Sequence, residues 1–376
     1  MRYKLKDGIP VAVDLFCGAG GLTEGLKNAG FLVVSAVEKD PAASETYAEN
    51  HPNVNLIKND IKKLDTTSIL KGTGVSRRAI DLLAGGPPCQ GFSVSNMKTR
   101  NMENPNNQLI YEFLRIVKEM NPKWVLLENV AGLKLFKKGM VVDELIKCFN
   151  ILGYKMEPIV LNAVNFGVPQ NRERFFFIGT RTKSKINFVE KLKNILVENP
   201  ITVEQAISDL PVLENGNSTC EIQYINTPQN EYQKKMREKV DNNVRNNLVS
   251  RNSTLVLERY KYIKQGENWE AVFKRRPDLM NNYEDPSRCH SGIYKRLVED
   301  KPSIVISNYR KNMLIHPLQD RGLSVREAAR LQSFPDHYIF KGPLSLQQQQ
   351  VANAVPPLLG ESVAREIIKK LKRNSK

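Results

Sequence analysis

The stretch VAVDLFCGAGGL, residues 11–22, joins an apolar run to a glycine-rich turn. Residues 11–16 predict a buried strand, and the three glycines after it predict a turn in which the backbone can approach a ligand closely. Apolar residues then recur at helical spacing until Gly30, which is expected to end the helix in the left-handed conformation. A strand that leads through such a turn into a helix is typical of an open, doubly wound α/β sheet.

The same alternation of short apolar runs and amphipathic stretches continues to about residue 180. Asp40 and Pro41 predict the start of a helix that ends at His51, and apolar stripes predict helices over 109–120 and 142–152. The fold class is therefore α/β, with a doubly wound, mostly parallel sheet. After the first strand, further strands are predicted at Phe31–Val37, Ile80–Ala84, Trp124–Leu127 and Arg174–Gly179.

The composition of the sequence changes at about residue 183, where Asn, Gln, Glu and Lys become frequent and apolar residues no longer recur at regular spacing. The stretch is too long to be a loop, so it is interpreted as a second, smaller domain. A final amphipathic helix is predicted over 357–372. The expected division is a large domain at 1–182, a small domain at 183–340 with a variable part at about 210–300, and a segment at 341–376 that returns to the large domain.

Composition and charge exclude some classes of protein and favour one kind of partner. The 376 residues are 41% hydrophobic and 26% charged, a globular mixture without an apolar stretch long enough to span a bilayer. Five cysteines without a CxxC pair disfavour a disulfide framework and a zinc finger, and no metal site is expected. The 56 Lys and Arg against 40 Asp and Glu favour a polyanionic partner.

Acidic residues after the second and third apolar runs point to a cofactor. Glu38 ends the second predicted strand, where a carboxylate can accept hydrogen bonds from both hydroxyls of a ribose. Asp60 follows the third run, where an adenine amino group can lie. Together with the glycine turn, these positions favour an adenosine-containing cofactor, and ordinary turns and caps are the alternative interpretation.

The segment GGPPCQGFS, residues 85–93, places Cys89 directly after a predicted parallel strand. Active sites of open α/β sheets lie at this edge, and flanking glycines and prolines favour an exposed loop. Glu128 ends another strand, and Arg172 and Arg174 introduce the last one. The sequence therefore predicts a site that brings together a catalytic cysteine, a carboxylate and guanidinium groups.

The sequence resembles the C5-cytosine-specific DNA methyltransferase family, of the bacterial restriction–modification type. The resemblance rests on six ordered motifs that span nearly the whole chain. One position departs from the family pattern, because Val351-Ala352 stands where Ile-Gly is usual, and a slight repacking near the cofactor is expected. The motifs are DLFCGAGGL at 14–22, GGPPCQGFS at 85–93, ENV at 128–130, QNRER at 170–174, REAARLQSFP at 326–335 and NAVPP at 353–357.

The resemblance implies a Rossmann-like fold that binds S-adenosyl-L-methionine, with S-adenosyl-L-homocysteine as the product. Phe16 is expected against the adenine, Glu38 at the ribose, and Asp60 with Ile61 at the base. The small domain is expected to contain the target-recognition region. The remaining cofactor residues that the resemblance implies are Gly18, Gly20, Leu22, Pro88, Leu109 and Asn353.

The resemblance also implies the chemistry. Cys89 adds to C6 of a cytosine swung out of duplex DNA, which gives C5 the electron density to accept a methyl group. Glu128 is expected to bind N3 and the exocyclic amine, and Arg172 or Arg174 to lie near O2. Gln90 and Ser93 are expected to contact the flipped nucleotide or its phosphate.

Several expectations concern the setting of the enzyme. It is expected to act as a monomer in the bacterial cytoplasm, associated with the nucleoid through double-stranded DNA and paired functionally with a restriction endonuclease. The alternatives are an RNA cytosine-5 methyltransferase on the same scaffold and a non-catalytic DNA-binding regulator. A nicotinamide dehydrogenase is disfavoured because it leaves the segment around Cys89 without a role.

Overall fold

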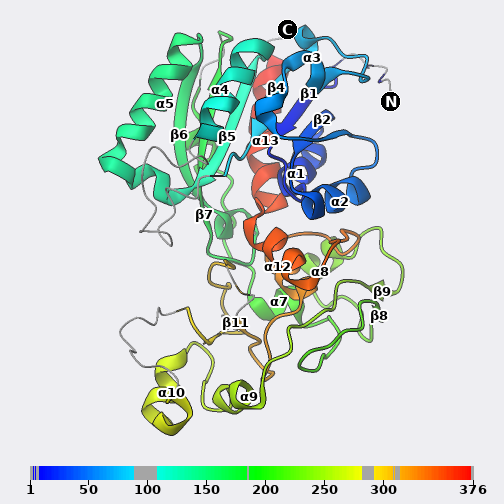
Figure 1. Ribbon diagram of the computed structural model, residues 1–376, viewed down its shortest axis with the longest axis vertical. Coiled ribbons are helices and arrows are strands. Elements are labelled where there is room, and N and C mark those ends of the chain that lie inside the picture. The colour runs from blue at the N-terminus through cyan, green and yellow to red at the C-terminus, as the bar shows by residue number, and fades with distance from the viewer. Residues whose placement is uncertain are drawn as a thin grey trace. The chain divides into compact units, whose positions relative to one another are not determined.

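The computed structural model describes residues 3, 5, 8–88, 108–183, 186–281, 292–307, 309 and 314–373. The chain forms two compact units, coloured along the chain in Figure 1. The first comprises Met1–Phe166, Glu173–Val197 and Val355–Lys376, and the second Gly167–Arg172 and Glu198–Ala354. These boundaries differ from the predicted ones at 183 and 341. The short segment 167–172 belongs to the second unit, although the residues before and after it in the chain belong to the first.

The first unit is built on a seven-stranded sheet with the order β3-β2-β1-β4-β5-β7-β6. The first five strands pair in parallel, whereas β7 is antiparallel to both of its neighbours. The predicted mostly parallel α/β class is therefore confirmed. The strands are β1 (Val11–Leu15), β2 (Leu32–Glu38), β3 (Asn55–Lys58), β4 (Leu82–Gly85), β5 (Trp124–Val130), β6 (Lys155–Asn162) and β7 (Glu173–Thr180).

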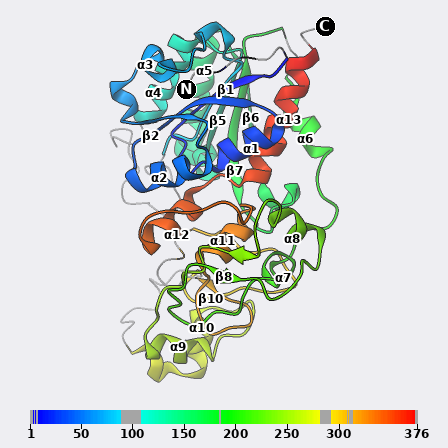
Figure 2. The ribbon, with the colours of Figure 1, turned by 90° about the vertical axis from the view of Figure 1, so that its right-hand side faces the viewer.

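Alternation along each strand supplies apolar side chains to both faces of this sheet. Val13 and Val125 belong to a core that α3, α4 and α5 cover, while Trp124 on the opposite face packs edge-on against Phe188 of α6. Figure 2 shows α3, α4 and α5 on one side and α6 and α13 on the other. The helices of this unit are α1 (Gly21–Ala29), α2 (Pro41–Asn50), α3 (Thr66–Leu70), α4 (Gln108–Met120), α5 (Met140–Ile151), α6 (Phe188–Lys193) and α13 (Pro357–Arg373).

Local signals set the ends of the first helices. Gly30 has a φ of 108° and ends α1 in the left-handed conformation, as predicted. Asp40 begins α2, and its Oδ1 accepts a hydrogen bond from the Ala43 N–H at 2.8 Å. The C-cap of α2 is His51, also as predicted.

Glycine allows α1 and α13 to pack unusually closely. A Cβ built on Gly25 would lie 2.6 Å from the Glu361 backbone nitrogen and 2.7 Å from the Pro357 carbonyl oxygen, both in α13. On the α13 side, a Cβ on Gly360 would lie 3.3 Å from Leu22. The helix that follows the glycine turn is thus held by the last helix of the chain.

Replacing Gly25 with alanine is expected to destabilise the protein although alanine favours helix. Overpacking against the backbone of α13 should lower the free energy of unfolding by about 1–3 kcal/mol. This loss outweighs the gain of about 1 kcal/mol from the higher helix propensity of alanine. Thermal unfolding should show a lower midpoint for Gly25→Ala. Asn28→Ala, at an exposed position of the same helix, serves as the control. An unchanged midpoint for Gly25→Ala would contradict the close packing.

The second unit contains short helices and two small sheets. β8 (Ile222–Gln223) pairs with β9 (Asn243–Val244) antiparallel, and β10 (Lys295–Arg296) pairs with β11 (Leu314–Ile315) in parallel. A separate apolar cluster around Tyr260 joins the region of α9 and α10. The helices are α7 (Val203–Ile207), α8 (Glu231–Met236), α9 (Thr254–Tyr260), α10 (Trp269–Arg275), α11 (Val325–Leu331) and α12 (Leu344–Asn353).

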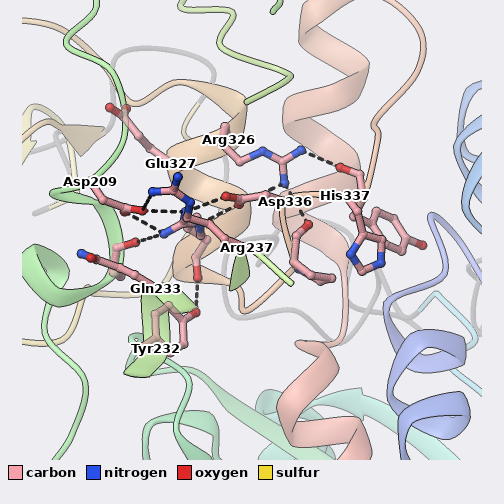
Figure 3. A network of polar contacts seen from close by, with 12 residues as sticks. Asp209, Tyr232, Gln233, Arg237, Arg326, Glu327, Asp336 and His337 are labelled. Carbon is pink, nitrogen blue, oxygen red and sulfur yellow. Dashed lines mark hydrogen bonds and ion pairs between the residues drawn. The ribbon is translucent and has the colours of Figure 1, made fainter. Parts of the chain in front are cut away.

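The charged residues of the predicted motif at 326–335 are buried and paired (Figure 3). Arg330 contacts Asp209 at 3.0 Å and Asp336 at 2.6 Å, and these three side chains have no solvent exposure. Arg326 donates to the carbonyl oxygens of Pro335 and Tyr338. Because a buried charge is tolerated only when it is paired and hydrogen-bonded, this network fixes the interior of the second unit.

Candidate active site

The glycine turn after β1 has a strained backbone. Phe16 has a φ of 57°, which is uncommon for a residue with a side chain, and Gly18 and Gly20 have φ values of 54° and 92°. A Cβ built on Gly18 would have nothing within 4 Å, so this side of the turn is open. Leu22 is buried in the first turn of α1. The predicted cofactor residues of this segment thus form one compact turn.

The Glu38 carboxylate is fixed by backbone amides. Its Oε2 accepts from the Gly18 N–H, and its Oε1 accepts from the N–H groups of Lys39 and Asp40, all at 2.8 Å. The Glu38 carboxylate therefore joins the glycine turn to the end of β2. A carboxylate oriented in this way can still accept from ribose hydroxyls, because each oxygen has more than one lone pair.

Asp14 lies beneath the turn and has no solvent exposure. The Thr23 hydroxyl donates to its Oδ2 at 2.6 Å, whereas Oδ1 has no hydrogen-bond partner among the described residues. Burial raises the pKa of Asp14 to about 7, and the charges of Glu38 and Glu128 act in the same direction. Asp14 opens the motif at 14–22, but its complete burial and its raised pKa could not be predicted from the sequence.

Asp60 caps a short helical turn, Ile61–Lys63, whose backbone is bound by α4. Asp60 accepts from the Lys62 N–H at 3.0 Å, and Ile61 is buried with Leu109 in the core of the first unit. Arg115 of α4 donates to the Ile61 carbonyl oxygen at 3.0 Å. Arg115 therefore links the backbone at Ile61 to α4, a contact that could not be predicted from the sequence.

Glu128 lies against the segment that follows β4. A Cβ built on Gly86 would be 2.8 Å from Glu128 Oε2, so only glycine leaves room for this carboxylate. The Asn129 side chain donates to the Pro87 carbonyl oxygen at 3.2 Å and fixes the same segment. Pro88, the next residue, is exposed. Glu128 is thus held beside the start of the predicted cysteine loop.

Arg174 pairs with Glu128, with Nε 2.9 Å from Oε1, and both side chains are only 11% exposed. The pair forms because β7 runs antiparallel to β5, which places Arg174 opposite Val130 in the register. Burial lowers the pKa of Arg174, and the neighbouring Glu128 opposes that change. A buried, aligned guanidinium and carboxylate can bind the polar edge of a planar heterocycle.

Arg172 and Asn353 belong to the second unit. The Arg172 guanidinium donates to the carbonyl oxygens of Ala352 and Ala354, at 2.6 and 3.1 Å. Asn353 lies between these two residues and is exposed. Arg174 pairs with the Glu128 carboxylate, and Arg172 donates to these backbone carbonyl oxygens.

The predicted catalytic Cys89 and the predicted substrate contacts Gln90 and Ser93 lie outside the described residues. Within the described part of the chain, no cluster of three or more His, Cys, Asp or Glu side chains could hold a metal ion. No helix in that part is both long and apolar enough to cross a membrane.

The family model of the C-5 cytosine-specific DNA methylases matches residues 11–369. The match extends over almost the whole chain and includes every segment of the site described above. The chain belongs to this family. It is therefore a DNA (cytosine-5)-methyltransferase, as the resemblance implied.

Two relatives of this DNA methylase are similar over most of their length. The chain is 36% identical to the Type II methyltransferase M.DdeI of Desulfomicrobium norvegicum, over 94% of this chain and 88% of the relative. It is 34% identical to the Type II methyltransferase M1.HphI of Haemophilus parahaemolyticus, over 95% and 86%.

Solved structures show the same fold. A prophage-encoded protein of Escherichia coli, assigned as a DNA modification methyltransferase, superposes with a TM-score of 0.78 at 27% identity, over 96% of this chain and 99% of the other. The Dnmt2 methyltransferase of S. pombe gives 0.60 at 16% identity, over 98% and 99%, which shows the fold alone.

Proposed function

We propose that this DNA methylase transfers a methyl group from S-adenosylmethionine to C5 of a flipped-out cytosine in a specific duplex sequence. We further propose that Cys89 adds covalently to C6, and that the enzyme belongs to a Type II restriction–modification system, as the names of its relatives suggest. The observation that carries the chemistry is the Glu128–Arg174 pair, held beside the segment that leads into Cys89.

The chemical argument begins with the weak nucleophilicity of cytosine C5. Addition of the Cys89 thiolate to C6 gives C5 carbanion character, and negative charge develops at N3 and O2. We assign Glu128 to N3 and the exocyclic amine, and Arg174 to O2, since preorganised polar groups stabilise such charge best. After methylation, loss of the C5 proton and departure of the Cys89 sulfur restore the aromatic ring.

The residues of the first unit fit the proposed cofactor. The turn is open at Gly18, and the adjacent Glu38 carboxylate is oriented by three backbone amides. S-adenosylmethionine supplies the methyl group when it is bound there. Glu38 would hold its ribose, and Asp60 and Ile61 would contact its adenine.

Glu38→Ala is expected to weaken the binding of S-adenosylhomocysteine about 10- to 100-fold, because hydrogen bonds to a charged group are lost. The same change removes the acceptor for the Gly18 N–H, which loosens the glycine turn. Isothermal titration calorimetry measures this binding, and Glu45→Ala, on the exposed face of α2, is the control. An unchanged affinity for Glu38→Ala would contradict the assignment of the ribose site.

Bisulfite sequencing of DNA from cells that express the chain tests the proposed function most broadly, because it reports the modified base and its context. We expect 5-methylcytosine in one recurring duplex sequence. Methyl transfer to transfer RNA in place of duplex DNA would support the RNA alternative. Absence of methylation in both substrates would contradict the proposal.

A further inference from the structure

Asp14 is a buried titratable group to which the proposed reaction assigns no role. It lies at the carboxyl end of β1, in parallel register with Ala36 of β2 and Ala84 of β4. Side chains alternate along a strand, so Asp14 belongs to the same face of the sheet as Glu38, two residues beyond Ala36. The register of β4 with β5 places Glu128 on this face as well. Three carboxyl groups are therefore gathered on one face at the carboxyl edge of the sheet.

The groups that donate hydrogen bonds to these carboxylates differ in charge. The Thr23 hydroxyl donates to Asp14 Oδ2 at 2.6 Å, and no described residue donates to Asp14 Oδ1. Glu38 accepts from three backbone N–H groups. Glu128, by contrast, pairs with the guanidinium of Arg174. The charge of Glu128 is therefore compensated by a cation, whereas neutral donors stabilise Asp14 and Glu38.

Two titratable groups at the glycine turn respond to this negative charge. Burial raises the pKa of the Cys17 thiol, and the charges of Asp14 and Glu38 raise it further. Burial likewise raises the pKa of Asp14 to about 7, and the charges of Glu38 and Glu128 act in the same direction. Like charges close together disfavour ionisation, and a cation bound near them relieves that cost. The glycine turn is therefore suited to a positively charged ligand.

S-adenosylmethionine carries a positive charge on its methylated sulfur, whereas the sulfur of S-adenosylhomocysteine is neutral. One carbon atom joins this sulfur to the ribose that we assign to Glu38, and the methyl group must reach a cytosine at Glu128. β1 lies between β2, which ends at Glu38, and β4, which is the neighbour of β5 and Glu128. The charged sulfur is therefore expected near the carboxyl end of β1, where Asp14 lies.

We propose that Asp14 is a specificity-determining residue: its buried carboxylate favours the positively charged methyl donor over the neutral product. The inference rests on the proposed function, because it requires the cofactor to bind at the glycine turn. Two charges several ångströms apart inside a protein interact strongly enough to change an affinity about tenfold. The attraction ends when the methyl group is transferred, so the same carboxylate promotes exchange of product for a new methyl donor.

Asp14→Asn removes the charge but keeps an oxygen that can accept from Thr23. Calorimetry without DNA measures the dissociation constants of S-adenosylmethionine and S-adenosylhomocysteine. At about pH 8, Asp14→Asn should reduce the preference for S-adenosylmethionine about tenfold and leave S-adenosylhomocysteine affinity within about threefold of the wild type. Glu45→Gln, which neutralises an exposed carboxylate on α2, is the matched control and should keep the wild-type preference. Equal weakening of both ligands in Asp14→Asn would overturn the inference, because a purely structural role predicts that result.

The pH dependence tests whether Asp14 is the group responsible. Above its pKa the Asp14 carboxyl group is ionised and attracts the charged sulfur, so the wild-type preference for S-adenosylmethionine should rise as the pH increases through about 7. Thr23→Val removes a hydrogen bond that favours the ionised form, so the rise should occur at higher pH in that variant. A wild-type preference that stays constant from about pH 6 to 8, or an unshifted rise in Thr23→Val, would overturn the inference.

His51 is the neighbouring group that ordinarily titrates near neutral pH. Its ring packs against Tyr47, whose hydroxyl contacts Thr23, and its Nδ1 lies 3.9 Å from Glu24 Oε2. Asp14→Asn retains His51, so a rise with pH that persists in this variant would overturn the assignment to Asp14.

The wild-type pH profile and Thr23→Val keep the test decisive if Asp14→Asn disturbs folding, since both retain the Asp14 carboxyl group. A wild-type protein that binds neither S-adenosylmethionine nor S-adenosylhomocysteine would instead contradict the proposed function. Binding of both ligands with the same preference in wild type and Asp14→Asn would contradict the role of Asp14 alone.

Discussion

Cys89→Ala is expected to abolish methyl transfer to duplex DNA, while S-adenosylhomocysteine binds within about twofold of the wild-type affinity. The proposed reaction has no alternative nucleophile, because C5 is unreactive until C6 carries a substituent. We expect cofactor binding to persist because Glu38, Asp60 and Ile61 are held by backbone amides, Arg115 and the core of the first unit.

The measurement is transfer of labelled methyl groups, with calorimetry on the same preparation. Cys148→Ala in α5 is the matched control, because Cys148 is partly buried against the same core. It should retain near-normal turnover. Substantial turnover in Cys89→Ala would contradict the assignment of the nucleophile.

Gly86→Ala is the second change with a large expected effect, and it is derived from the structure alone. The new Cβ would lie 2.8 Å from Glu128 Oε2, the end of a flexible side chain, so the carboxylate must move while the fold is retained. A displacement of about 1 Å in a group that orients the substrate can cost about 100-fold in rate. We expect a loss of turnover of that order, with little change in the thermal midpoint.

Gly322→Ala is a suitable control, because its Cβ would meet only the Leu314 carbonyl oxygen at 3.7 Å, an ordinary contact. Methyl transfer, and release of tritium from cytosine labelled at C5, should fall together in Gly86→Ala, since both reactions depend on Glu128. Normal turnover in Gly86→Ala would show that the position of the Glu128 carboxylate does not limit the reaction.

The glycine turn and the adjacent acidic residue of the proposed cofactor site could be predicted because their signals are local. A strand, a glycine turn and an acidic residue after the next strand are contiguous in sequence, and parallel strands bring their ends to one edge. Phe16, Gly18 and Glu38 accordingly lie together. The contact of Arg115 with the Ile61 carbonyl oxygen could not be predicted, because the two residues are 54 positions apart in the chain.

The arginines show where local patterns fail. The segment before a parallel strand would lie at the opposite edge of the sheet from Glu128, and only the antiparallel direction of β7 brings Arg174 to the Glu128 carboxylate. No periodicity in the sequence encodes strand direction. Arg172 has the same residue type and similar spacing, but long-range backbone contacts place it in the second unit.

The second unit resisted prediction for a different reason. Apart from α12, its helices have five to seven residues and its strands two, too short for a hydrophobic period to be visible. Buried ion pairs such as Arg330 with Asp209 organise much of its interior. Sequence patterns normally assign charged residues to the surface. An interior built partly from charged pairs therefore shows no pattern of apolar residues from which it could be predicted.

Covalent trapping tests the central chemistry most directly. A duplex oligonucleotide with 5-fluorocytosine at the target position is incubated with the enzyme and S-adenosylmethionine, because fluorine at C5 cannot leave as a proton does. The proposed reaction predicts a complex that survives denaturation, with the oligonucleotide mapped by mass spectrometry to the sulfur of Cys89. Methylated product without such a complex, or an adduct at another residue, would contradict it.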